Sequence, residues 1–119
     1  MNAAERFPKK EHLIKSKEFR TVYTKGTPFR KGAFVLYAMP NGLGWNRLGL
    51  SISARNIKRA TRRNRIKRLF REVYRRTKSK TRTGHDLFII VKKDDKNFGT
   101  YNQAEIVFSD LLKKARITS

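Results

Sequence analysis

The sequence predicts a single α+β domain with a small mixed sheet, and three observations support this fold class. The chain of 119 residues is long enough for one modest hydrophobic core. Segments with apolar residues at helical spacing alternate along it with short runs typical of strands. No internal repeat or linker divides residues 1–119. Residues 1–15 are basic and lack a clear period, so we expect a flexible arm that either has no role or settles along a phosphate backbone.

The composition predicts a polyanionic partner. The formal net charge is +21, while hydrophobic residues make up 38% of the chain, too many for wholesale disorder. Nucleic acid is the leading candidate, because each neutralised phosphate releases condensed counterions. No apolar run approaches the roughly 18 residues of a membrane-spanning helix. The chain has no cysteine, which excludes disulfides and thiolate metal sites. A cytoplasmic protein is the simplest interpretation.

The first predicted helix starts at Ser16, which can cap it, and ends at Gly26, a suitable residue after a helix. Within it Phe19, Val22 and Tyr23 lie at positions i, i+3 and i+4, so they form one apolar face. We expect Val22 to pack on the sheet.

Two strands are predicted next. The first covers residues 33–39 and is closed by Pro40, and the second returns antiparallel to it over residues 47–53 after a turn at residues 41–42. Side chains of the second strand alternate between bulky apolar residues on one face and small residues on the other, namely Gly49, Ser51 and Ser53. One face of this strand therefore carries almost no bulk.

A shallow groove is expected over that face if Tyr37 lies on the same side. Phe19 and Tyr23 of the first helix are candidates for its wall, with Ser51 and Ser53 on its floor. Unpaired bases stack on such aromatic rings at roughly 1–3 kcal/mol each. The alternative is that these rings only fill the core.

The segment Arg55–Arg76 concentrates the positive charge and is expected to be a single helix, with Glu72 as its one acidic residue. Its second half is amphipathic, because Leu69, Phe70 and Val73 share a stripe with Ile66. The first half differs, since its arginines surround the helix axis and no core accepts guanidinium groups. This end is expected to project past the sheet into the polyanion through Arg59, Arg62, Arg63 and Arg65.

The last two elements are a strand and a helix. Asp86 opens a strand over residues 87–91, whose continuous apolar run indicates an interior strand covered on both faces. The strand–helix–strand order permits a parallel crossover, which is normally right-handed. Thr100 and Gln103 match a capping box that starts the final helix. The apolar stripe of that helix is Ala104, Val107, Phe108, Leu111 and Ala115.

No catalytic constellation is visible. His12 and His85 are the only histidines and lie far apart, so we interpret them as surface residues rather than metal ligands. Asp94 and Asp95 can bind a divalent ion weakly, but a solvated loop explains them better. The chain also lacks a glycine-rich phosphate loop. By itself it is interpreted as a binding module.

The run RNRIKRLFRE from Arg63, directly after the strand LGLSIS and its basic loop, resembles the protein subunit of bacterial ribonuclease P. The resemblance extends over essentially the whole chain, including the FVLY and DLFIIVK strands. It implies one α/β sandwich whose crossover is left-handed, against the usual rule. It also implies that an RNA subunit performs the hydrolysis with magnesium ions bound mainly by that RNA, none being held by the protein alone.

The resemblance implies two binding surfaces and no catalytic residue in the protein. The basic helix is expected to contact the catalytic RNA through Arg55, Arg59, Arg62, Arg63, Asn64, Arg65, Lys67, Arg68 and Arg71. The cleft between the first helix and the sheet is expected to hold the single-stranded 5′ leader of precursor tRNA through Phe19, Tyr23, Tyr37, Ser51 and Ser53. The assembly then removes the leader as an endonuclease in tRNA processing. The alternatives are a structural RNA-binding protein of the ribosome and, less favoured, a cationic membrane binder.

Overall fold

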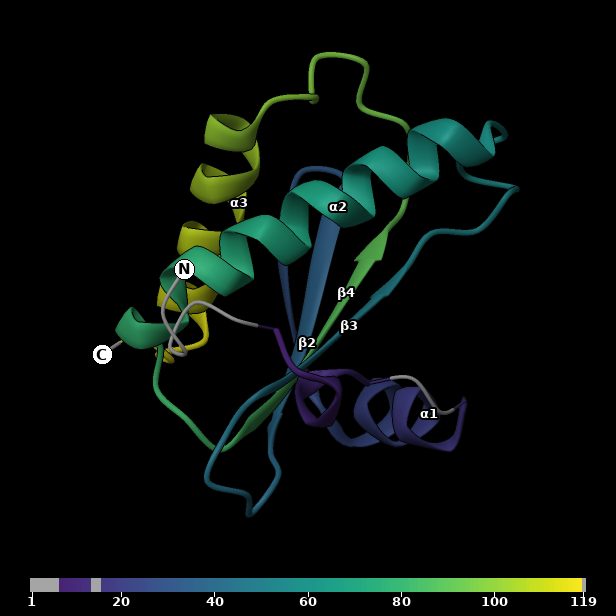
Figure 1. Ribbon diagram of the computed structural model, residues 1–119. Helices are drawn as coiled ribbons and strands as arrows, with labels where there is room; N and C mark the ends of the chain where they lie inside the picture. The colour runs from purple at the N-terminus through teal and green to yellow at the C-terminus, as the bar shows by residue number, and fades with distance from the viewer. Residues whose placement is uncertain (1–6, 14–15, 119) are drawn as a thin grey trace.

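The computed structural model describes residues 7–13 and 16–118 (Figure 1). No helix within these ranges is long and apolar enough to cross a bilayer. The elements in chain order are η2 Lys9–Glu11, α1 Ser16–Lys25, β1 Thr27–Lys31, β2 Phe34–Pro40, β3 Arg47–Ser51, α2 Ala60–Thr77, η3 Lys78–Lys80, β4 His85–Val91 and α3 Tyr101–Lys114.

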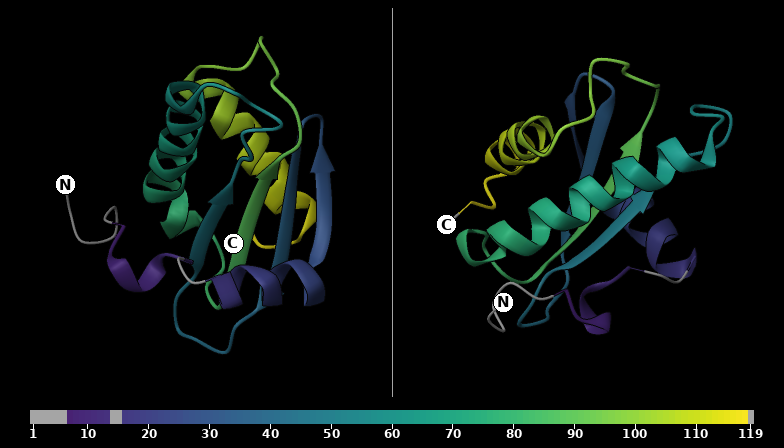
Figure 2. Two further views of the ribbon diagram at one scale, coloured as in Figure 1. Left: turned by 90° about the vertical axis from the view of Figure 1, so that its right-hand side faces the viewer. Right: turned by 45° about the horizontal axis from the view of Figure 1, so that its top comes forward.

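The strands of the described residues form one four-stranded mixed sheet in the order β1-β2-β4-β3. β2 pairs antiparallel with β1 and with β4, while β3 and β4 are parallel. Helices α2 and α3 cover one face of the sheet and α1 covers the other (Figure 2). Seen from the α2 side with β3 and β4 running upward, β4 lies to the left of β3 (Figure 1). The α+β fold class and the left-handed crossover are thereby confirmed.

The main core lies between the sheet and the helices α2 and α3. Leu36, Leu48 and Ile89 point to this face from three neighbouring strands and meet Phe70 and Phe108 of the two helices. A smaller cluster lies on the opposite face under α1, where Leu13, Val22 and Phe88 are buried. The predicted packing of Val22 on the sheet is confirmed.

Two local predictions are confirmed in detail. The Thr100 hydroxyl accepts a hydrogen bond from the Gln103 backbone N–H (3.2 Å), and the Gln103 side chain accepts one from the Thr100 N–H (3.0 Å), which completes the capping box of α3. β4 lies at the interior of the sheet, and both of its faces are covered, because Leu87 and Ile89 are buried in the main core and Phe88 is buried in the smaller cluster under α1. In both cases a short stretch of sequence carries the whole signal.

The strand order corrects the expected pairing. β3 does not pair with β2, because β4 enters between them and pairs with both. The continuous apolar run of β4 is best buried at the centre, which accounts for the insertion. β1 was not predicted, because Pro28 argues against a strand. Pro28 is tolerated because β1 is an edge strand.

Gly26 follows α1 for a different reason from the one expected. Its φ is not in the left-handed region, in contrast to Gly32, Gly42 and Gly84. A Cβ at Gly26 would lie 2.4 Å from the Val22 carbonyl oxygen and 3.3 Å from that of Ala38. Close packing of the turn against the helix and β2 therefore requires glycine here. Ser16 is the first residue of the helix.

Residues 7–13 do not form the expected free arm. The Leu13 N–H donates to the Leu48 carbonyl (3.0 Å), and Leu13 is buried. Glu11 is also buried, where it accepts hydrogen bonds from the Tyr74 hydroxyl (2.6 Å) and the Lys78 ammonium (3.0 Å). The hydrogen bond of Leu13 holds the segment against β3, and those of Glu11 hold it against α2 and η3. The remainder of residues 1–15 lies outside the described residues.

Candidate nucleic-acid interface

Helix α2 begins at Ala60, so the prediction of a single helix from Arg55 is wrong for its first five residues. The N–H groups of Asn56 and Ile57 donate to the Ser53 carbonyl (3.1 and 3.0 Å) and close a turn. The Asn56 side chain then donates to the Val91 carbonyl (3.0 Å), and Ile57 is buried in the main core. These anchors draw the segment across the end of β4, which is incompatible with a straight helix.

Three of the predicted RNA-binding arginines donate hydrogen bonds to loops of the same chain. Arg62 donates to the Asp94 carboxylate (3.1 Å) and to the backbone carbonyls of residues 95 and 98 (2.9 and 2.6 Å). Arg63 donates to the carbonyls of residues 57 and 58 (2.7 and 2.8 Å), and Arg65 to that of Gly99 (2.8 Å). Irregular loops leave carbonyls without ladder partners, and a guanidinium has five N–H donors to satisfy them. The expectation that this end simply projects into a partner is therefore corrected.

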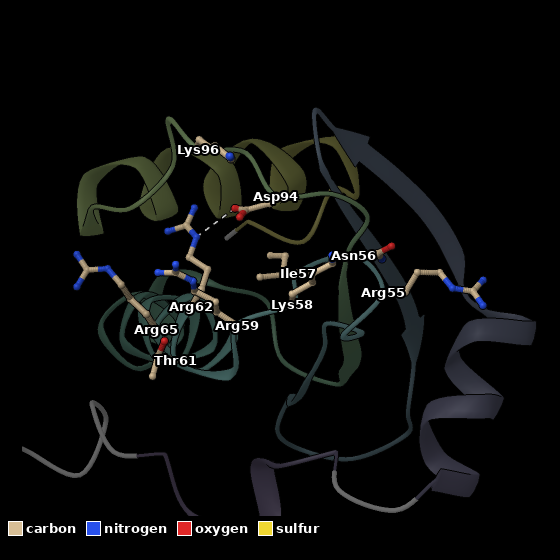
Figure 3. Close-up of a pocket in the computed structure, with 10 residues that line it drawn as sticks. All are labelled: Arg55, Asn56, Ile57, Lys58, Arg59, Thr61, Arg62, Arg65, Asp94 and Lys96. Atoms are coloured by element: carbon tan, nitrogen blue, oxygen red, sulfur yellow. Dashed lines mark hydrogen bonds and ion pairs between the residues drawn. The ribbon is translucent and has the colours of Figure 1, made fainter.

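The loop and the start of α2 enclose a hollow rich in positive charge (Figure 3). Arg59 and Lys58 line it from the loop before α2, and Lys96 lines it from the loop before α3. Sequence reasoning missed Lys96, because only the tertiary fold brings that loop beside α2. Arg55 points away from the other lining residues, toward the side on which α1 lies (Figure 3). Arg55 is thus set apart from the remaining predicted contacts to the catalytic RNA.

The rest of α2 divides as expected between core and surface. Ile66, Phe70 and Val73 are buried, whereas Asn64, Arg68 and Arg71 are exposed and Lys67 is partly exposed. Leu69 is only partly buried. Tyr74 was not among the predicted core residues, yet it is fully buried, and burial together with its bond to Glu11 raises the pKa of its hydroxyl. A tyrosine among arginines gives no local signal of such a role.

The acidic residues around α2 are engaged by cations of the same chain. Glu72 pairs with Arg75 and Arg76 on the next turn, and these partners hold the pKa of its carboxyl below the usual value. Asp94 pairs with Arg62. Because these carboxylates form internal pairs, they leave the remaining arginines and lysines of this surface available to an external anion.

The aromatic residues of the expected groove have the predicted sidedness. Tyr37 pairs with Phe88, which pairs with Gly49, so all three share the sheet face under α1. Phe19 stacks on Phe88 with ring centroids 5.0 Å apart. A Cβ on Gly49 would lie 2.5 Å from the Phe19 ring. The absence of bulk at Gly49 is therefore what lets Phe19 approach the sheet.

Tyr23 and Tyr37 form the open part of this groove. Their ring centroids lie 4.9 Å apart, and Tyr23 is 49% exposed. Burial and the neighbouring Tyr23 hydroxyl raise the pKa of Tyr37. Ser51 is partly exposed on the same sheet face, whereas Ser53 lies beyond the end of β3, where its hydroxyl accepts a hydrogen bond from the Asn56 N–H (3.2 Å). The structure thus brings together four of the five predicted groove residues and leaves Ser53 in the adjoining turn.

An ion-pair network that the sequence analysis missed positions α1 over the groove. Arg47 binds both carboxylate oxygens of Asp86 (2.8 and 2.7 Å) and also donates to Glu18 of α1 (2.7 Å). Asn41 donates to Asp86 as well (2.9 Å). Asp86 is buried, while Arg47 and Glu18 are each about a quarter exposed. These residues are far apart in the chain, so no local sequence pattern predicts their ion-pair network.

The described part of the chain contains no group of three or more histidine, cysteine, aspartate or glutamate side chains able to hold a metal ion. Besides the pairing of Asp94, the Asp95 carboxylate accepts a hydrogen bond from the Asn97 N–H (3.0 Å). His12 contacts the Phe7 carbonyl through Nε2 (3.1 Å) and stacks on the Phe7 ring. His12 thus has a packing role in the N-terminal segment.

Sequence comparisons point to one family. A family model for ribonuclease P matches residues 7–116. The chain is 37% identical over 110 residues to the ribonuclease P protein component of Clostridium botulinum (strain Loch Maree / Type A3), covering 92% of this chain and 97% of that protein. It is 33% identical over 107 residues to the ribonuclease P protein component of Alkaliphilus metalliredigens, covering 90% and 95%.

Solved structures agree with the sequence comparisons. The RNase P protein of Staphylococcus aureus is similar with a TM-score of 0.81 and 29% identity, over 92% of this chain and 98% of that chain. The RNase P protein of Thermotoga maritima is similar with a TM-score of 0.77 and 28% identity, over 87% and 96%. The fold, the basic helix and the family match therefore agree, and this chain belongs to the ribonuclease P protein family.

Proposed function

We propose that this chain is the protein subunit of ribonuclease P and binds two RNAs on opposite faces of its sheet. The α2 side binds the catalytic RNA subunit, and the groove beside α1 binds the single-stranded 5′ leader of precursor tRNA. Together they support endonucleolytic removal of the leader, which yields mature tRNA 5′ ends in the cytoplasm. The observation that carries the proposal is that the strongly basic helix α2 and the aromatic cluster under α1 lie on opposite faces of the sheet. Figure 2 shows the two helices on these faces.

The α2 side suits a folded RNA. Arg59, Lys58 and Lys96 surround the basic hollow, and Arg68 and Arg71 extend the positive charge along the helix. Arginine favours bidentate phosphate contacts. Arg62, Arg63 and Arg65 fix the loops that carry these groups, so their part is to shape the surface as well as to contact RNA.

The groove suits an unpaired strand. The Tyr23 and Tyr37 rings offer partly exposed faces for bases, and each stacked base contributes roughly 1–3 kcal/mol. Stacking needs no particular base, which matches a leader that differs from one precursor tRNA to the next. Ser51 adds a hydroxyl on the floor for a hydrogen bond to the strand.

We place catalysis in the RNA subunit. Magnesium ions, bound mainly by that RNA, supply a nucleophilic water and stabilise charge at the scissile phosphate. The protein's share is to hold both RNAs and to lower the repulsion between their phosphates. The match to the ribonuclease P family model disfavours the alternative of a structural ribosomal protein.

Reconstitution tests this function directly. The protein is mixed with its cognate catalytic RNA and a precursor tRNA at low magnesium concentration, where phosphate repulsion is least screened, and 5′ cleavage is followed. We expect the protein to raise the cleavage rate and to lower the concentration of precursor tRNA at which the rate reaches half its maximum. No increase over the RNA alone would show that the assignment is wrong.

A further inference from the structure

A second hollow lies between α2 and α3, and the function above does not use it. It is lined by Arg68, Leu69, Glu72, Arg76 and Tyr101. At about 100° per residue, Arg65, Arg68, Glu72 and Arg76 fall within one strip of α2 about 80° wide. Arg65 also lines the first hollow, so the two hollows follow one line along the helix.

Two flat groups that contact each other line this second hollow. The Arg76 guanidinium lies over the Tyr101 ring, with Cζ 5.4 Å from the ring centroid. Its Nε donates to the Glu72 carboxylate (2.8 Å), yet the Arg76 side chain remains 56% exposed. Burial and a hydrogen bond to Glu105 raise the pKa of the Tyr101 hydroxyl. Both groups are therefore held in place while part of the guanidinium faces solvent.

The local charge favours a base over a phosphate at this point. Glu72 pairs with both Arg76 and Arg75 and cancels one of their two positive charges, and the Glu105 carboxylate beside Tyr101 supplies a second negative charge, so the inner part of the hollow has little net positive charge. Leu69 and the Tyr101 ring add apolar walls. Arg68, at the border of the hollow, is exposed and suits a phosphate. Unpaired RNA bases stack on aromatic rings and on arginine planes, so this arrangement matches a nucleotide with its base inward and its phosphate at Arg68.

We propose that an unpaired base of the catalytic RNA stacks on the Arg76–Tyr101 pair between α2 and α3. This inference rests on the proposed function, because it extends the surface that binds the catalytic RNA. The catalytic RNA is the occupant rather than precursor tRNA, since the hollow continues the basic line of α2, while the aromatic residues proposed for the leader lie under α1 on the opposite sheet face (Figure 2).

Equilibrium binding of the full chain to the catalytic RNA alone, over a series of salt concentrations, tests the inference. Replacing Tyr101→Ala is expected to weaken binding about 5- to 150-fold, the equivalent of one lost stacking contact of roughly 1–3 kcal/mol. The slope of log affinity against log salt should not change, because no phosphate contact is lost. Tyr101→Phe keeps the ring and should bind like the wild type. Arg76→Lys keeps the charge but removes the plane, and should weaken binding without changing the slope.

Ile106→Ala is the matched control, because Ile106 is exposed on the same helix outside the hollow. Thermal unfolding shows whether each variant is folded. If Tyr101→Ala does not fold, the binding of the Arg76→Lys variant decides whether a base stacks at this hollow. Failure of the wild type to bind the catalytic RNA refutes the proposed function itself. Normal binding by the folded Tyr101→Ala and Arg76→Lys variants overturns only this inference. A flatter salt slope for the Tyr101→Ala variant would indicate a lost phosphate contact and would also overturn the inference. So would a loss of affinity that is seen only with precursor tRNA.

Discussion

The buried ion pair between Arg47 and Asp86 is expected to contribute strongly to the free energy of unfolding. Replacing Arg47→Leu removes both hydrogen bonds from Arg47 to Asp86 and leaves a buried carboxylate with the Asn41 amide. Removing one partner of a buried pair costs about 3–5 kcal/mol, because the remaining charge is left without compensation. At roughly 2.1 cal/mol/K per residue, unfolding of 119 residues has an entropy near 0.25 kcal/mol/K, so the melting temperature should fall by about 12–20 °C.

Calorimetry or circular dichroism at neutral pH and fixed ionic strength measures this shift. Arg82→Leu is the matched control, because it removes one exposed positive charge without breaking a buried pair. The double variant Arg47→Leu with Asp86→Leu should recover much of the loss, since no charge is then buried alone. A melting temperature within about 2 °C of the wild type for Arg47→Leu would refute the reasoning.

Arg47→Leu should also separate the two RNA-binding surfaces. The side chain ties Glu18 of α1 to the sheet, so its loss releases the helix that carries Phe19 and Tyr23. We expect weaker binding of precursor tRNA at a temperature where the variant is folded, with little change for the catalytic RNA. Equal losses for both RNAs would mean that Arg47 does not act through the groove.

The remaining predictions concern the groove and the helix. Gly49→Ala brings a Cβ within 2.5 Å of the ring above it and should destabilise the fold by about 1–3 kcal/mol in urea unfolding, whereas Gly44→Ala, with open space around it, should be close to neutral. Arg65→Ala with Arg68→Ala should weaken catalytic-RNA binding and flatten its salt dependence by about 0.9 per lost phosphate contact at most, and an unchanged slope would remove the helix from the interface. Tyr23→Ala should reduce affinity for precursor tRNA more than for mature tRNA, and equal effects would exclude leader stacking.

The family and most elements follow from local sequence patterns. The capping box at Thr100 and Gln103, the apolar run of β4 and the stripe through Ile66, Phe70 and Val73 each depend on neighbours within a few residues. Such patterns report which backbone conformation a segment prefers and which face it buries. The sidedness of the groove was also predictable, because alternation along a strand sets which residues share a face.

Other features were hidden because they depend on residues distant in the chain. The insertion of β4 between β2 and β3 follows from competition among all strands for the centre of the sheet. β1 has no strand signal of its own and forms because β2 pairs with it. Arg62 carries the same charge whether it points to solvent or, as here, to the loop at residues 94–98.

The charge and most helices and strands of this chain can be predicted without a structure, because they depend on composition and short-range periodicity, and the family follows from the resemblance of its motifs. Folding sets which arginines support loops, how Arg47 and Asp86 place α1, and where α2 meets Tyr101. The physical reason is that a guanidinium or a ring takes its role from the partners that folding brings to it, and those partners lie tens of residues away.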